Sequence, residues 1–265
     1  MRIGITGCAG RMGQALVREI LGTAGAELAG GTERPGSPDL GRDIGQVAGL
    51  DPLGLPVSAD AAALFAASDA VIDFTSPAAS VAHAALAAAS GTALVVGTTG
   101  LKAPDTAALH AAAAGAAIVH APNMSLGVNV LMALVERTAA ILGPEFDIEI
   151  VEMHHRHKVD APSGTALGLG RAAAAGRKVE LDAVKETVRD GITGARAAGK
   201  IGFATLRGGD VIGDHSVIFA GDGERLELAH KASSRSLFAK GAVRAALWTK
   251  GQAPGVYSMR DVLGL

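Results

Sequence analysis

The stretch Met1–Leu21 reads MRIGITGCAGRMGQALVREIL and decides the fold, because a strand, a loop and a helix follow one another within it. Arg2–Thr6 is a short apolar and β-prone run, and Arg11–Leu21 places apolar side chains at helical spacing. Three glycines lie between them in the pattern G-x-x-G-x-x-G: Gly7, Gly10 and Gly13. Glycines permit a tight turn close to a pyrophosphate, and a helix N-terminus favours its negative charge. The stretch therefore predicts the first unit of a parallel sheet that binds a dinucleotide.

Short apolar runs continue to alternate with helical runs as far as residue 120. We expect strands at 26–31, 70–74, 93–97 and 117–120, and helices at 59–67, 78–89 and 105–114. The Gly- and Pro-rich stretch 35–56 is expected to be a surface loop. Alternation of this kind is typical of a parallel sheet with helices on both faces, so an α/β, Rossmann-like domain is predicted.

The pattern changes after Pro122. A long helix is expected at 126–142 and a strand with one wet face at 147–153. Three later segments, 201–206, 214–220 and 225–230, are expected to be antiparallel strands joined by glycine-rich turns at 208–210 and 221–223. A last helix is expected at 240–250. These segments predict a second domain of the α+β class.

Composition narrows the classes of protein. The chain has 265 residues, 49% hydrophobic and 19% charged, which is globular and long enough for one large or two modest domains. Aromatics are 3% and the net charge is −2, which argues against a general nucleic-acid or membrane-surface binder. A single cysteine, no signal peptide and no run of about 18 apolar residues favour a cytoplasmic enzyme.

Two charged residues follow the second expected strand. Glu33 is placed to bind a ribose 2′-hydroxyl, and Arg34 is placed to bind a 2′-phosphate, so both NADH and NADPH are candidates. The alternative is a tight turn with a solvent-facing Glu-Arg pair.

Arg11 is either a phosphate contact or a solvated helix residue. Cys8 is expected to fill space in the loop, because no histidine or acid adjoins it.

Three small polar loops follow other expected strands: Phe74–Pro77, Gly97–Gly100 and Ala121–Met124. Each is compatible with an ordinary turn. Because open α/β sheets bind ligands at the carboxyl ends of their strands, three such loops together favour a cofactor crevice.

The segment Glu152–Asp160, EMHHRHKVD, is the densest cluster of titratable groups in the chain. A metal site is one interpretation, but consecutive histidines seldom converge on one ion and the neighbouring cations would repel it, so no metal is expected. A solvated charged loop is another. The third is proton transfer and binding of an anionic substrate. Ser163 is a plausible N-cap of a following helix, whose first-turn N–H groups at Gly164 and Thr165 would suit a carboxylate, so a dianionic small molecule is favoured.

Glu152–Leu167, EMHHRHKVDAPSGTAL, resembles the signature of the dihydrodipicolinate reductase family. The resemblance extends along the chain through GCAGRMG at 7–13, FTSP at 74–77, GTTG at 97–100, APNMSLGVN at 121–129 and HKASSRSLFAKGAVRAALW at 230–248. It implies a dinucleotide-binding domain of residues 1–122 plus 235–265 and a substrate-binding and tetramerisation domain of residues 123–234. It also implies a homotetramer that reduces 4-hydroxy-tetrahydrodipicolinate with NADH or NADPH and loss of water.

The resemblance also implies roles for particular residues. His154 is then the proton donor/acceptor and Lys158 the proton donor, while His155, Gly164 and Thr165 contact the substrate. The implied cofactor contacts are Gly7, Cys8, Ala9, Gly10, Arg11, Met12, Glu33, Arg34, Gly97, Thr98, Thr99, Ala121, Pro122, Asn123 and Met124. Met124 replaces a phenylalanine and Pro122 a small residue of some relatives, which puts side-chain packing on the nicotinamide in doubt.

Two other functions are compatible with a dinucleotide fold. One is a different Rossmann-type dehydrogenase, such as an aspartate or homoserine dehydrogenase, against which the HHRHK cluster before SGT argues. The other is an NAD(P)-sensing protein without turnover, which would bind cofactor without consuming it.

Overall fold

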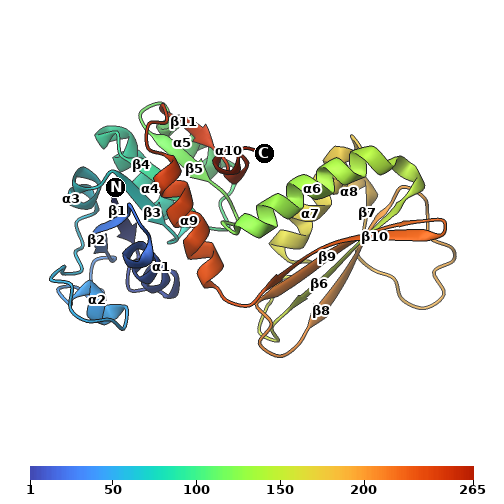
Figure 1. Cartoon of the computed structure of the whole chain (residues 1–265), viewed down its shortest axis with the longest axis horizontal. Coiled ribbons are helices and arrows are strands. Elements are labelled where there is room, and N and C mark those ends of the chain that lie inside the picture. The colour runs from blue at the N-terminus through green and yellow to red at the C-terminus, as the bar shows by residue number, and fades with distance from the viewer. The chain divides into compact units, whose positions relative to one another are not determined.

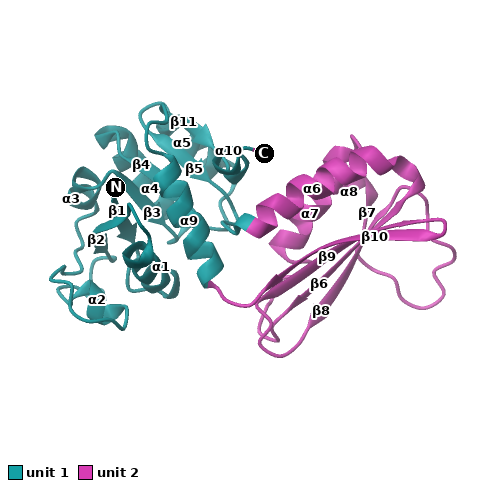
Figure 2. Cartoon of the chain, in the orientation of Figure 1, with its two compact units in different colours: residues 1–126, 236–264 teal, residues 127–235, 265 magenta.

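The computed structural model describes all residues, 1–265, and the chain forms two compact units (Figures 1 and 2). Unit 1, teal in Figure 2, contains Met1–Leu126 and Ser236–Gly264. Unit 2, magenta, contains Gly127–Arg235 together with Leu265. The chain therefore leaves the first unit once and returns to it through its last segment.

Unit 1 is built on a six-stranded parallel sheet in the order β11-β5-β4-β3-β1-β2. Its strands are β1 (Arg2–Thr6), β2 (Glu27–Thr32), β3 (Ala70–Asp73), β4 (Ala93–Val96), β5 (Ala117–His120) and β11 (Gly255–Tyr257). All residues of β3 and β4 are buried, as expected for strands covered on both faces. The strand order reverses between β1 and β3, which is where sheets of this kind bind ligands.

Helices cover both faces of this sheet. The bounds are α1 (Arg11–Gly22), α2 (Ile44–Val47), α3 (Ala61–Ala67), α4 (Pro77–Ser90), α5 (Ala103–Ala112), α9 (Ser236–Trp248) and α10 (Met259–Leu263). Helices α1, α9 and α10 share one apolar core with β1, while α3, α4 and α5 share another with β4. Helix α9 packs closely because most residues on its buried face have small side chains or none. A Cβ added at Gly241 would overlap the Met124 carbonyl oxygen.

Unit 2 pairs a five-stranded sheet, in the order β10-β9-β6-β8-β7, with helices on one face. Its strands are β6 (Asp147–His154), β7 (Lys185–Glu186), β8 (Ile201–Arg207), β9 (Gly213–Gly221) and β10 (Glu224–Ala232). The helices are α6 (Leu126–Leu142), η1 (Gly143–Glu145), α7 (Gly164–Gly176) and α8 (Leu181–Val184). Alternate residues of β6 are buried, so Ile148 and Ile150 pack against α6 and α7.

The expectation that all later strands are antiparallel is wrong for β8. This strand pairs with β6 in parallel, whereas β9 pairs with β6 and with β10 in antiparallel fashion. Because β6 lies between β8 and β9, the turn at Gly208–Asp210 crosses over β6 and does not close a hairpin. Helices α7 and α8 form part of the crossover that parallel pairing of β6 and β8 requires.

The segment Leu126–Glu145 is long and apolar enough to pass a test for membrane-spanning helices based on length and composition. Core helices of globular proteins pass the same test. Here Leu131, Val135 and Ala139 of α6 belong to the core of unit 2. The helix therefore packs in this core, while Val130, Leu134 and Ile141 of the same helix are exposed.

Candidate functional site

The glycine loop of unit 1 presents an uncapped helix N-terminus. Gly7 has φ +68°, in the left-handed region that favours glycine, and its N–H donates to the Thr32 carbonyl at 2.8 Å. A Cβ added at Gly13 would overlap the Gly7 carbonyl oxygen and lie 2.6 Å from the Cys8 Cα. Helix α1 starts after Gly10, which has no side chain to accept from the first-turn N–H groups. These donors and the close backbone fit a cofactor pyrophosphate.

Glu33 is joined to this loop. Its carboxylate accepts from the Ala9 N–H at 2.9 Å, and the adjacent Arg34 is exposed. Cys8 is buried beneath Gly31, and burial, followed by the charge of Glu33, raises the pKa of its thiol to about 12. The thiol is therefore protonated at neutral pH and is not a nucleophile.

A buried carboxylate connects two of the three loops at the strand ends. Asp73, the last residue of β3, accepts from Thr75 N at 2.8 Å and from Thr75 Oγ1 at 2.6 Å, and lies 2.9 Å from His83 Nδ1. Thr98 Oγ1 donates to the same carboxylate at 3.4 Å and accepts from Thr75 N at 3.0 Å. Burial opposes ionisation of Asp73, but hydrogen bonds from His83 and Thr75 outweigh it and lower its pKa. Sequence reasoning missed Asp73 and His83.

The third loop lies against the same sheet. Ala121 N donates to the Val96 carbonyl at 3.2 Å, and Pro122 is exposed. The Met124 side chain is 1% exposed and belongs to the core of unit 1, so this residue offers a ligand its backbone and not its side chain.

The second constellation, in unit 2, is centred on the carboxylate of Glu152. This side chain is 1% exposed and accepts four hydrogen bonds. Arg207 donates two, to Oε2 and Oε1, each at 2.9 Å. The Ser163 N–H donates at 3.0 Å, and the His154 ring donates from Nδ1 at 2.5 Å. Burial would raise the pKa of Glu152, but the hydrogen bonds of Arg207 and His154 lower it, so the group is a carboxylate at neutral pH.

His154 stands at the end of β6 and is 8% exposed. Burial lowers its pKa, the Glu152 hydrogen bond opposes that shift, and the charges of Lys158 and Arg207 add to it. His154 is therefore neutral at pH 7. Its Nε2 faces Gly213, where an added Cβ would approach to 3.0 Å. Glycine at this position leaves room beside the ring.

The loop after β6 carries the other residues expected at the site. Lys158 Nζ lies 2.8 Å from Asp160 Oδ1, and the Arg235 guanidinium lies 3.4 Å from His155 Nε2. Arg156 and His157 are exposed. Ser163 caps α7 by accepting from the Ala166 N–H at 3.2 Å, as predicted, and Gly164 and Thr165 are the first two residues of that helix. Histidine, lysine and the helix N-terminus thus lie in one segment of unit 2.

Sequence reasoning missed two more members of this constellation, Arg207 and His215. The His215 ring contacts His154 edge to face, with centroids 5.1 Å apart, and its Nε2 lies 3.2 Å from Ser163 Oγ. Burial, then the charge of His154, lowers the pKa of His215 to about 4. The alternation of β6 would have placed Glu152 beside His154 on one face, whereas Arg207 and His215 come from strands whose pairing is not local.

Glu152, His154 and His215 bring their ligating atoms within 4.8 Å of one another, a spacing compatible with a metal ion. Arg207, however, occupies both oxygens of Glu152, and its charge would repel a cation. The donor set as arranged here suits proton transfer better than metal binding.

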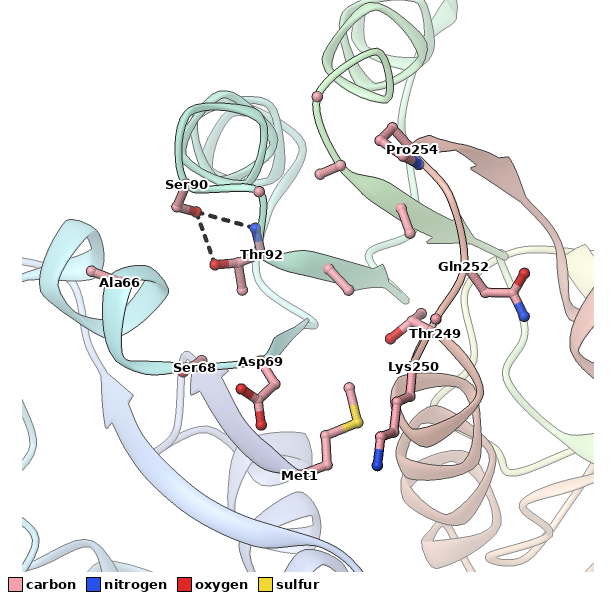
Figure 3. Close-up of a pocket in the computed structure, with 16 residues that line it drawn as sticks. Met1, Ala66, Ser68, Asp69, Ser90, Thr92, Thr249, Lys250, Gln252 and Pro254 are labelled. Atoms are coloured by element: carbon pink, nitrogen blue, oxygen red, sulfur yellow. Dashed lines mark hydrogen bonds between the residues drawn. The ribbon is translucent and has the colours of Figure 1, made fainter.

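A cavity of unit 1, about 620 Å³, lies at the opposite edge of the sheet, where the strands begin (Figure 3). Helices α3, α4 and α9 end there, and nearby hydroxyl groups cap their carbonyls. Thr92 donates to Phe65 O at 2.8 Å, Ser90 to Leu86 O at 2.8 Å and Thr249 to Ala246 O at 2.6 Å. These hydroxyls serve the helix ends, and the cavity lies away from the carboxyl ends of the strands, where sheets of this kind bind ligands.

Two family models match the chain over almost its whole length. The one described as "Dihydrodipicolinate reductase, N-terminus" covers residues 1–124, and the one described as "Dihydrodipicolinate reductase, C-terminus" covers residues 127–263.

Named proteins agree with the family models. The 4-hydroxy-tetrahydrodipicolinate reductase of Brucella abortus (strain 2308) is 58% identical over 266 residues, covering 100% of this chain and 99% of the relative. That of Rhizobium rhizogenes (strain K84 / ATCC BAA-868) is 57% identical, covering 100% and 97%. Among solved structures, the dipicolinate-bound dihydrodipicolinate reductase of Paenisporosarcina sp. TG-14 has a TM-score of 0.76 at 25% identity, covering 97% of both chains.

Proposed function

The chain belongs to the dihydrodipicolinate reductase family, and we propose that it reduces 4-hydroxy-tetrahydrodipicolinate to tetrahydrodipicolinate with NADH or NADPH, in diaminopimelate and lysine biosynthesis. The observation that carries this proposal is the segment of unit 2 in which the Glu152–His154 pair and Lys158 precede the N-terminus of α7. Proton-handling groups beside a carboxylate site are what a cyclic dicarboxylate that loses a hydroxyl requires.

Unit 1 binds the cofactor in this proposal. The loop Gly7–Met12 holds the pyrophosphate, Glu33 and Arg34 hold the adenosine ribose, and Gly97–Thr99 and Ala121–Met124 hold the nicotinamide end. The reduced nicotinamide, when bound, supplies a hydride. Asp73 serves this site indirectly, because it fixes Thr75 and Thr98 at the ends of β3 and β4.

Unit 2 binds the substrate and handles protons. The N–H groups of Gly164 and Thr165 at the start of α7 hold one carboxylate, and His155 contacts the substrate. Lys158 donates the proton with which the 4-hydroxyl leaves as water. His154 accepts a ring proton at Nε2 as the hydroxyl leaves and returns it to the ring when the hydride adds, so His154 ends in its starting state. One hydride and one proton enter and one water leaves, so the charge and atoms of the ring product balance.

The choice between the two cofactors is proposed to depend on Glu33 and Arg34. Glu33→Ala is expected to weaken NADH binding about tenfold and NADPH binding less, because it removes a ribose hydroxyl acceptor. Arg34→Ala is expected to do the reverse. Fluorescence titration with each cofactor measures both dissociation constants. Glu27→Ala, at the exposed start of the same strand, is the control. Equal effects of each change on both cofactors would contradict the assignment.

We propose that the open face of the unit 2 sheet forms a homotetramer. Helices cover one face, while Val151, Met153 and Ile218 lie on the other and Leu206 is 49% exposed. Light scattering on the purified protein should give four times the chain mass of 26.4 kDa. Ile218→Asp should lower that mass, because it removes an apolar side chain from this face and places a second carboxylate opposite Glu149. A monomer mass for the unmodified chain would refute the proposal.

The single cysteine supports a cytoplasmic location.

A further inference from the structure

Arg207 connects the two proton-handling residues of unit 2. Its guanidinium donates to both oxygens of Glu152, which holds His154, and its Nη2 also donates to the Asp160 carbonyl at 2.6 Å. Asp160 in turn holds Lys158 through its carboxylate, at 2.8 Å. Arg207 of β8 therefore hydrogen-bonds both to Glu152, the partner of His154, and to Asp160, the partner of Lys158.

The Glu152 carboxylate also decides which nitrogen of His154 carries the proton. An ionised carboxylate only accepts hydrogen bonds, so the Nδ1 atom that lies against it must be an N–H. Burial keeps the ring neutral, with a low pKa, and a neutral imidazole has one N–H. The proton is therefore absent from Nε2, which is left with a lone pair on the side of Gly213.

We propose that Glu152 and Arg207 are positioning residues of the reductase, which hold His154 as the Nδ1–H tautomer with Nε2 ready to accept a proton and keep Lys158 beside it as the donor. This inference rests on the proposed function for its catalytic meaning, but the tautomer is a property of the free protein. The charged and titratable groups that face His154 are Glu152 on its own strand, Arg207 on β8, His215 on β9 and Lys158 in the loop.

The direct test is nitrogen NMR of the ligand-free protein labelled at histidine, with His154 assigned by comparison with His154→Gln. The expected result at neutral pH is a protonated Nδ1 and an unprotonated Nε2. A ring protonated at Nε2 would overturn the proposal, whether or not the protein turns over substrate. Failure of turnover with the expected tautomer would refute the proposed function and leave this assignment standing.

Kinetics of Glu152→Gln separate positioning from a structural role. The substitution keeps the side-chain size but removes the charge that raises the His154 pKa. We expect kcat to fall about tenfold and KM to change less than about twofold. A tenfold loss is at the lower end of the losses of activity seen when a group that orients an active-site ligand is removed. Because activity requires neutral His154, the acid limb of the kcat/KM profile should move to lower pH.

The matched control is Glu149→Gln. Glu149 lies on the same strand and is bound by two arginines, Arg189 and Arg196, where Glu152 is bound by Arg207 alone, and it faces away from His154. The acid limb of the kcat/KM profile of Glu149→Gln should coincide with that of the unmodified enzyme. Arg207→Lys, which keeps a charge but loses the two-point contact with Glu152, should lower kcat in the same direction as Glu152→Gln. An unmoved acid limb in Glu152→Gln, or an equal shift in Glu149→Gln, would refute the proposal.

Discussion

Lys158→Ala is expected to lower kcat by about 10²-fold or more, the usual scale for loss of a general acid. The hydroxyl that leaves the substrate ring must take up a proton, and Lys158 is its proposed donor in the segment that precedes α7. His154→Ala is expected to lower kcat on the same scale, because it removes the only ring that Glu152 orients. Both effects should fall mainly on kcat, since the proposed carboxylate contacts at Gly164 and Thr165 are left in place.

Steady-state kinetics with saturating cofactor measure both losses, and cofactor affinity should be unchanged because unit 1 is unaltered. Lys185→Ala is the control: this lysine pairs with Asp182 in the same unit, away from the segment 152–165. Near-normal turnover by both Lys158→Ala and His154→Ala would show that neither residue transfers the proton.

Gly13→Ala is expected to destabilise unit 1 and to abolish cofactor binding. The added methyl would overlap the Gly7 carbonyl and crowd the Cys8 backbone, and neither can move without breaking the hydrogen bonds from Gly7 and Cys8 to Thr32. Overpacking of this kind costs about 1–3 kcal/mol of folding free energy. Because the same backbone forms the loop proposed to bind the pyrophosphate, cofactor affinity should fall even where the protein remains folded.

Gly22→Ala, in the same helix, is the matched control. No atom lies within 4 Å of a Cβ added there, so the change should be neutral or stabilise the protein by up to about 1 kcal/mol. Urea unfolding and cofactor titration of the two variants make the comparison. Equal stability and equal affinity of Gly13→Ala and Gly22→Ala would contradict the tight-loop argument.

The α/β part of the fold could be predicted because its signals are local. Each strand of unit 1 from β1 to β5 is a short apolar run beside its own helix, and the expected strand 117–120 and helix 126–142 match β5 and α6. Strand β11 was missed, since Gly255–Tyr257 is too short to show a pattern and pairs with β5, far earlier in the chain. The parallel pairing of β8 was missed for the same reason: it depends on β6, not on neighbouring residues.

The candidate site likewise contains residues that the local sequence reveals and residues that only strand pairing brings in. His154, Lys158 and the cap at Ser163 stand out from residue types within one segment, and that segment is also where the structure has its buried Glu152–His154 pair. Arg207 lies 55 positions from Glu152 and reaches it only because β6 and β8 pair. His215 reaches Ser163 across 52 positions through the pairing of β9. Groups that orient the site come from distant strands, so one sequence without its fold does not reveal them.

In the proposed reaction this chain reduces a cyclic 4-hydroxy dicarboxylate and oxidises a reduced nicotinamide. The most direct measurement supplies freshly made product of the synthase that forms this substrate, with NADH and NADPH in separate reactions, and follows nicotinamide oxidation and the ring product together. We expect one cofactor to be oxidised per tetrahydrodipicolinate formed, and this turnover to be lost in Lys158→Ala. Cofactor binding without oxidation, or the same slow oxidation with and without the substrate, would contradict it.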